Sequence, residues 1–214
     1  MKITPIIVGQ LEVNCYVVYD EVSLKAVVID PGDEFEKISS VIDNYGLSPE
    51  YIIFTHAHYD HVCATRELKD KYGVRIVMHK DEKSVCEMTK NQCVIWGYEA
   101  DDFPLVDLEV SDGDRISAAG TSFGILHTPG HTPGGICIYV ENTVFTGDTL
   151  FRDSVGRTDL PGGNTEKLIL SLNRLMQLPA DTRVLCGHGD ETTVGRESRV
   201  NPFINSKFKL KFFS

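Results

Sequence analysis

The sequence predicts an α/β protein with mixed β-sheets, and two features of its patterning lead to that class. Short runs rich in β-branched residues recur along the whole chain, each bounded by Gly, Pro, Asp or Asn, which is typical of strands. Between them lie longer stretches in which apolar residues recur at helical spacing. Because strand-like and helix-like stretches are interspersed, we expect layers of sheets and helices.

Nine segments have the strand pattern. They are Ile3–Val8, Val13–Tyr19, Ala26–Ile29, Tyr51–Thr55, Arg75–Met78, Ser122–Leu126, Gly135–Val140, Thr143–Thr146 and Arg183–Cys186. Three stretches have an apolar stripe with a Gly or Pro beyond it, namely Glu34–Tyr45, His61–Tyr72 and Thr165–Leu178. A helix is also expected over Lys80–Trp96, although the stripe there is less regular.

Length and composition indicate one soluble globular domain. The 214 residues are 42% hydrophobic and 24% charged, and no repeat or polar linker divides them. We therefore expect a single domain over 1–214, in which 206–214 could form a loosely ordered tail. Without a run long enough to span a bilayer or a secretory signal, the sequence favours a cytoplasmic protein that does not act on membranes.

The net charge of −10 bears on the partners of this protein. Such a balance opposes binding to phosphate backbones, so no nucleic-acid partner is expected. A small anionic substrate remains compatible, because a metal and a few local arginines can reverse the field in a pocket. A homo-oligomer is also compatible with the sequence.

The strongest chemical signal is the segment from Thr55 to His61, directly after a predicted strand. It carries four candidate ligands within six residues: His56, His58, Asp60 and His61. His56 and His58 would project to the same side if strand geometry continued through them. This mixture of imidazole and carboxylate suits zinc, iron or manganese better than calcium.

Three further candidates, His131, Asp148 and His188, stand at ends of predicted strands beside Gly or Pro. Turns of this kind would give ligands a fixed geometry, as a metal site requires. His79 and His127 lie outside this pattern, and packed or surface histidines are their expected roles.

The motif HxHxDH at 56–61, followed by His131, Asp148 and His188, resembles the metallo-β-lactamase superfamily. The strand and turn from Val27 to Gly32 resembles an early motif of the same family, so the resemblance covers nearly the whole chain. It implies an αββα sandwich of two mixed sheets flanked by helices, with metals at one edge.

The resemblance also implies a centre of two divalent metal ions. One metal would be bound by His56, His58 and His131, the second by Asp60, His61 and His188, and Asp148 would bridge both. Zinc is expected, and iron or manganese would also fit. Asp30 resembles an aspartate that holds the ligands from behind. The predicted nucleophile is a metal-bound hydroxide, with Asp60 and Asp148 as catalytic groups.

Further stretches, Gly147–Phe151, Val155–Gly163, Gly189–Gly195 and Glu197–Phe203, resemble short bacterial hydrolases related to glyoxalase II (hydroxyacylglutathione hydrolase). That resemblance implies hydrolysis of a thioester such as S-D-lactoylglutathione. Arg157 corresponds to a basic residue that contacts glutathione, and its alternative role is a surface salt bridge. From the length of the sequence, the helical domain of the full-length enzyme is not expected here, and Asp159 and Asp190 stand in stretches where that enzyme has tyrosines.

Other functions compete with thioester hydrolysis. Persulfide dioxygenases share the fold and a stretch like Gly156–Asp159, but use one iron bound by two histidines and a carboxylate. A non-enzymatic, metal-stabilised binding module is disfavoured because structural zinc sites are often rich in cysteine. The acidic charge disfavours RNA processing, and the missing secretion signal disfavours antibiotic hydrolysis.

The segment Lys83–Phe103, which contains Trp96 and Tyr98, is expected either to form a lid beside the pocket or to pack over the core.

Overall fold

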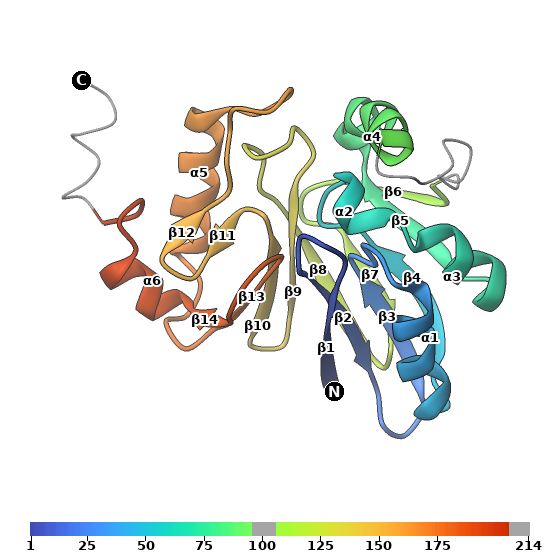
Figure 1. The fold of residues 1–214 in the computed structure, drawn as a ribbon. Coiled ribbons are helices and arrows are strands. Elements are labelled where there is room, and N and C mark those ends of the chain that lie inside the picture. Colours follow the sequence, from blue (N-terminus) through green and yellow to red (C-terminus); the bar gives the residue numbers. More distant parts are fainter. Residues whose placement is uncertain (96–105, 206–214) are drawn as a thin grey trace.

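A computed structural model describes residues 1–95 and 106–205 of the chain. Two six-stranded mixed sheets pack face to face, and helices cover the outer face of each (Figure 1). This is the αββα sandwich, so the predicted fold class is confirmed.

The first sheet contains the first six strands in chain order. They are β1 (Lys2–Val8), β2 (Val13–Tyr19), β3 (Lys25–Ile29), β4 (Ser48–Ile53), β5 (Arg75–His79) and β6 (Leu108–Val110). Neighbours from β1 to β3 are antiparallel, and those from β3 to β6 are parallel. The carboxyl ends of three neighbouring parallel strands, β3, β4 and β5, therefore meet at one edge of this sheet.

The second sheet has the order β14-β13-β10-β9-β8-β7. Its strands are β7 (Arg115–Ala118), β8 (Thr121–His127), β9 (Ile136–Val140), β10 (Thr143–Gly147), β13 (Arg183–Cys186) and β14 (Thr192–Thr193). Only β10 and β13 are parallel neighbours. A separate small hairpin pairs β11 (Leu150–Phe151) with β12 (Ser154–Val155).

The helices divide between the two outer faces. The first sheet is flanked by α1 (Phe35–Asn44), α2 (Tyr59–Val62), α3 (Thr65–Tyr72), the 3-10 turn η1 (Lys80–Glu82) and α4 (Lys83–Ile95) (Figure 1). The second is flanked by α5 (Thr165–Leu175) and α6 (Val194–Val200). Three apolar clusters follow from this layering, one under each helical layer and one between the sheets. The middle cluster contains the fully buried Phe123 and fixes how the sheets face each other.

Two expected elements differ from the structure. The strand predicted over Tyr51–Thr55 ends at Ile53, so His56 and His58 lie on a loop rather than on a continuing strand. The helix predicted over His61–Tyr72 is interrupted between Val62 and Thr65. Asp60 and His61 therefore lie within the short helix α2.

The interruption has a local cause. The backbone N–H groups of Cys63 and Ala64 donate to the carbonyls of Gly32 and Pro31, at 3.1 Å each. Those bonds fix α2 against the turn that follows β3. The approach is so close that a Cβ atom on Gly32 would lie 1.7 Å from the carbonyl oxygen of Asp60. Only glycine fits there.

The sequence analysis did not predict the short elements. The strands β6, β7, β11, β12 and β14 have two to four residues each, too few to display a period of two. The helix α6 is also short, and Thr193 caps it by accepting from the N–H of Arg196 at 3.2 Å.

None of the described helices is long and apolar enough to cross a membrane. Part of the predicted lid segment is the helix α4, whose Val85 and Cys86 pack into the core of the first sheet. Trp96, Tyr98 and the predicted tail 206–214 lie outside the described residues.

Candidate metal centre

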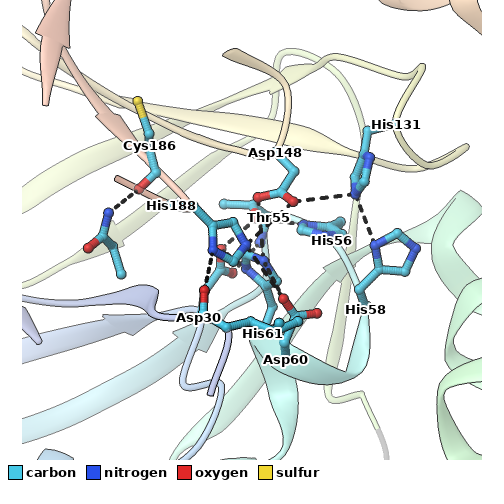
Figure 2. A network of polar contacts seen from close by, with 12 residues as sticks. Asp30, Thr55, His56, His58, Asp60, His61, His131, Asp148, Cys186 and His188 are labelled. Carbon is cyan, nitrogen blue, oxygen red and sulfur yellow. Dashed lines mark hydrogen bonds and ion pairs between the residues drawn. The ribbon is translucent and has the colours of Figure 1, made fainter. Parts of the chain in front are cut away.

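All seven predicted ligands lie at the carboxyl ends of strands and meet at one edge of the sandwich (Figure 2). The loop after β4 and the helix α2 supply His56, His58, Asp60 and His61. The second sheet supplies His131 after β8, Asp148 after β10 and His188 after β13. Residues far apart along the chain are thus brought together because these strand ends face one another across the two sheets.

Two ligand clusters can be distinguished. In each, the ligand atoms of three residues lie within 4.8 Å of one another; the clusters are His56 with His58 and His131, and Asp60 with His61 and His188. In the first cluster, Nε2 of His131 lies 2.9 Å from Nδ1 of His58. In the second, Oδ2 of Asp60 lies 3.6 Å from Nε2 of His61 and 3.5 Å from Nε2 of His188.

Asp148 lies between the two clusters. Its Oδ1 is 3.4 Å from Nε2 of His61, and its Oδ2 is 3.6 Å from Nε2 of His131 and 3.7 Å from Nε2 of His188. These contacts reach both sets of ligands, which is the position that a bridging carboxylate requires. The loop around Asp148 is closely packed, since a Cβ on Gly187 would lie 2.4 Å from its Oδ1.

Hydrogen bonds from within the protein orient four of the five histidines. Nδ1 of His131 donates to the carbonyl of Arg157 at 2.8 Å, and Nδ1 of His188 donates to the carbonyl of Leu11 at 2.9 Å. Each bond leaves the Nε2 atom of the same ring directed toward the cluster. Such partners fix both the tautomer and the ring orientation of a metal-binding histidine.

Asp30 orients the imidazole of His61 directly and that of His56 through Thr55. Its carboxylate accepts from the backbone N–H of Thr55 at 2.7 Å, from the Thr55 hydroxyl at 2.6 Å and from Nδ1 of His61 at 3.0 Å. The Thr55 oxygen lies 3.1 Å from Nδ1 of His56 and can accept its proton. The contacts of Asp30 agree with the supporting role that the sequence predicts for this residue.

The electrostatics of the centre favour the metal-binding forms of His56, His58 and Asp148. In His61 and His188, by contrast, burial alone would lower the pKa, but the carboxylates of Asp60 and Asp148 raise it overall, so a metal would displace a proton from these two rings. Burial lowers the pKa of His56 well below its usual value and that of His58 to about 4, and neighbouring imidazoles lower both further. Burial alone would raise the pKa of Asp148, but the imidazoles of His61, His131 and His188 lower it overall. Neutral imidazole and ionised carboxylate are the forms that bind metals.

Unpaired polar atoms test whether this residue set fits a metal. Among the described residues, Nε2 of His56, Nε2 of His61 and Oδ1 of Asp148 are buried without a hydrogen-bond partner. Buried polar atoms are normally paired, and these three belong to the converging ligand set. The donors are all imidazole and carboxylate, a set suited to zinc, iron or manganese. The residues therefore fit divalent metals.

Comparison with known proteins places this centre in a family. A model of the metallo-β-lactamase superfamily matches residues 8–188, a range that includes all seven ligands and Asp30. The chain belongs to the metallo-β-lactamase superfamily. Many members of this superfamily are hydrolases, and its fold binds divalent metals.

Two superfamily members similar to this chain match it over nearly their whole length. Hydroxyacylglutathione hydrolase GloC of Haemophilus influenzae is 38% identical over 212 residues, which cover 97% of this chain and 100% of the relative. The crystal structure of BLEG-1 B3 metallo-β-lactamase has a TM-score of 0.88 and 32% identity, covering 96% of this chain and 100% of its own.

Two other similar solved structures have names that do not refer to a hydrolase. TTHA1623, solved in a di-iron-bound form, has a TM-score of 0.85 and 41% identity, covering 94% of this chain and 99% of its own. ETHE1 from Myxococcus xanthus has a TM-score of 0.80 and 27% identity, covering 99% of this chain and 92% of its own. The superfamily fold is thus shared by proteins with different names, one of which was solved with two irons bound.

The two histidines outside the predicted pattern also lie outside both ligand clusters of this superfamily member. The rings of His79 and His127 stack at 4.0 Å with an angle of 14° between their planes. Asp81 lies nearby. Lone pairs of stacked, nearly parallel rings do not converge on one point. In addition, Nδ1 of His79 accepts from the N–H of Asp81, and Nε2 of His127 donates to the carbonyl of Pro133.

Apart from Asp30, sequence reasoning missed the groups that orient the ligands. The carbonyls of Leu11 and Arg157 belong to the backbone, so no side-chain motif could reveal them. Thr55 directly precedes the HxHxDH motif, and its hydroxyl position between Asp30 and His56 depends on the packing of β3 beside β4.

The side chain of Arg157 is engaged by Asp159. Its Nε and Nη2 atoms donate to the two oxygens of Asp159 at 2.7 and 2.8 Å, and both side chains are exposed. The Arg157 guanidinium lowers the pKa of Asp159 to about 2. Asp190, the other predicted departure from full-length glyoxalase II, accepts from Arg152 at 3.2 Å. Neither aspartate belongs to the ligand clusters.

Proposed function

We propose that this protein is a two-metal hydrolase of small acyl-thioesters such as S-D-lactoylglutathione, with zinc as its metal. The observation that carries the proposal is the pair of ligand clusters sharing Asp148. Full-length similarity to a hydroxyacylglutathione hydrolase supports the substrate class.

His56, His58 and His131 would hold one ion, Asp60, His61 and His188 the other, and Asp148 both. Two divalent ions so held lower the pKa of a water molecule toward neutrality and polarise the carbonyl of the substrate. The protein orients the ligands through Asp30, Thr55 and the carbonyls of Leu11 and Arg157. A thiolate leaves with little acid assistance, because a free thiol has a pKa of about 8.5.

Arg157 is proposed to bind an anionic group of the substrate. Its backbone carbonyl orients His131, so the segment lies directly against the metal centre. A substrate carboxylate would compete with Asp159 for the guanidinium. We expect Arg157→Met to raise KM and Asp159→Asn to lower it, while kcat changes less in both. Arg183→Met is the matched control, because Arg183 begins β13 at the end opposite His188 and pairs with Glu191.

A mononuclear-iron persulfide dioxygenase is the second candidate function. Likeness to ETHE1 and to a protein solved in a di-iron-bound form is compatible with it. One experiment separates the two: both substrates are assayed with a thiol reagent and an oxygen electrode, after metal analysis of the purified protein. Thiol release from S-D-lactoylglutathione without oxygen uptake, with about two metals per chain, supports the hydrolase. Oxygen uptake with glutathione persulfide and one tightly bound iron would replace it with the dioxygenase.

A further inference from the structure

A fully buried carboxylate, Glu82 on η1, lies behind one of the two ligand clusters. Its Oε1 accepts from the backbone N–H of Gly134 at 2.8 Å and from the hydroxyl of Thr132, and its Oε2 accepts from the N–H of Ala57 at 3.3 Å. None of these partners is a predicted ligand. Each of them, however, belongs to a loop that carries ligands.

The two loops are those of the first cluster. Ala57 lies between His56 and His58, and Thr132 directly follows His131. One carboxylate thus connects the loop after β4 with the loop after β8, and these loops belong to different sheets. Among the described contacts, no comparable bond from Glu82 reaches the helix α2 that carries Asp60 and His61, or the loop that carries His188.

The attachment is tight on both sides. The carbonyl of Ala57 accepts a hydrogen bond from the Thr89 hydroxyl on α4, so both backbone groups of this residue are held from the same helical segment. On the other side, a Cβ on Gly134 would lie 2.6 Å from the backbone nitrogen of Glu82. The loop that bears His131 therefore packs directly on η1.

The charge of Glu82 is not balanced by a neighbouring cation. No described lysine or arginine forms an ion pair with it, and burial raises its pKa to about 7. Glu197, the other fully buried glutamate of the described residues, has such a partner, since Nη1 of Arg196 lies 2.6 Å from its Oε1. An unbalanced buried carboxylate is costly unless a cation binds nearby. The loops that Glu82 binds carry His56, His58 and His131, a ligand set that would hold such a cation.

From these contacts we infer that Glu82 is a positioning residue for one of the two metals, the one bound by His56, His58 and His131. It sets the separation of the two loops through three hydrogen bonds and supplies negative charge behind a cationic site. Outer partners of this kind change metal affinity by about 10- to 100-fold when they are replaced. The inference rests on the two-metal centre of the proposed function but not on its substrate.

The test is a competition titration of metal-free protein with Zn²⁺ and a chromophoric chelator, compared between wild type and Glu82→Gln. Glutamine keeps the size of the side chain but has one acceptor oxygen, so one of the two loops would face an N–H donor. We expect one of two binding steps to weaken by about 10- to 100-fold while the other changes much less. Two unchanged steps would overturn the inference.

Glu197→Gln is the matched control, because it places an amide at an equally buried glutamate away from the ligand loops. An equal loss in both steps of both variants would indicate general destabilisation and would also overturn the inference. Should Glu82→Gln fail to fold, Thr132→Val removes one donor to Oε1 and should weaken the same single step. If the wild type binds fewer than two Zn²⁺, the proposed two-metal function itself fails, a result distinct from these.

Discussion

At the scale of single residues, the centre depends on imidazoles whose two nitrogens have different surroundings. In His61, His131 and His188, Nδ1 bonds to the protein and Nε2 faces the ligand cluster. His58 is the exception, since its Nδ1 faces His131. Replacing these groups would therefore alter the orientation of the ligands as well as their number.

Asp148 provides the most direct test of a shared ligand. Asp148→Ala removes the only described carboxylate that contacts imidazoles of both clusters, so both metals should bind more weakly and turnover should be lost. Elemental analysis and thioester hydrolysis measure the two effects. The exposed Asp70→Ala, which removes only a surface pair with Arg66, serves as control. A fully metallated and active Asp148→Ala protein would contradict the bridging role.

Glu82 should also affect how the stability of the metal-free protein varies with pH. The folded protein holds the Glu82 proton up to a pKa of about 7, against 4.5 for an ordinary glutamate, because burial disfavours the charged form and Asp81 adds negative charge. The unfolded chain thus binds fewer protons between these values, and stability falls as pH rises through this window. Over this rise in pH, the unfolding free energy of the wild type should fall by up to about 3 kcal/mol more than that of Glu82→Gln.

Urea unfolding at pH 4.5 and pH 7.5, with chelator present, measures this difference. The ligand histidines are the same in both proteins, so only the difference between the two curves reports on Glu82. Parallel curves would show that burial does not hold the Glu82 proton.

At the scale of elements, the ligands are carried by short connections after strands rather than by the strands. The turn after β3 and the helix α2 illustrate how close these connections lie, since Gly32 touches the backbone of Asp60. The second ligand cluster therefore depends on a residue with no functional group. A sequence motif defined by the type of side chain does not show that this glycine is needed.

We expect Gly32→Ala to displace α2 and to weaken metal binding at the cluster of Asp60, His61 and His188. Its Cβ would lie 1.7 Å from a backbone oxygen, so the backbone itself must move. Zn²⁺ titration and thermal unfolding measure the effect. Gly124→Ala is the control, because a Cβ there would meet only the carbonyl of Tyr139 at 3.6 Å, an ordinary contact. Wild-type metal affinity in Gly32→Ala would contradict the expectation.

Most long elements could be predicted from the sequence, because their periods and their Gly or Pro boundaries are local properties. Val13–Tyr19 and Arg183–Cys186 were predicted with their observed bounds. The break between α2 and α3 could not be, since it depends on hydrogen bonds to a turn that is distant in the sequence. The seven ligands could be named from motif and family resemblance, whereas Glu82 has no motif and is recognised only by what it touches.

At the scale of the whole molecule, the two sheets share the metal centre. Each ligand cluster takes two residues from the first sheet's side and one from the second's, and Asp148 also comes from the second. The sheets also contact each other through the apolar layer between them and through hydrogen bonds, such as the one from the Tyr16 hydroxyl to the carbonyl of Cys186 at 2.7 Å. A bound metal should therefore hold the sheets together as well as serve in the reaction.

Metal removal should lower the stability of the whole fold. A ligand present at about 1,000 times its Kd stabilises the folded state by about 4 kcal/mol, which corresponds to a Tm change on the order of 10 °C for a chain of this size. Thermal unfolding with and without chelator measures the shift, and Asp148→Ala should respond less. Equal melting temperatures of loaded and metal-free wild type would contradict a role in joining the sheets.

The division of each cluster between the sheets also sets an order of events as the protein matures. The segment up to α4 offers each ion only two side chains, and the segment from β7 onward offers it one side chain and a shared carboxylate. Neither segment alone has a complete set, so tight metal capture must follow the docking of the two halves. Ions bound in this way would stabilise a fold that has already formed.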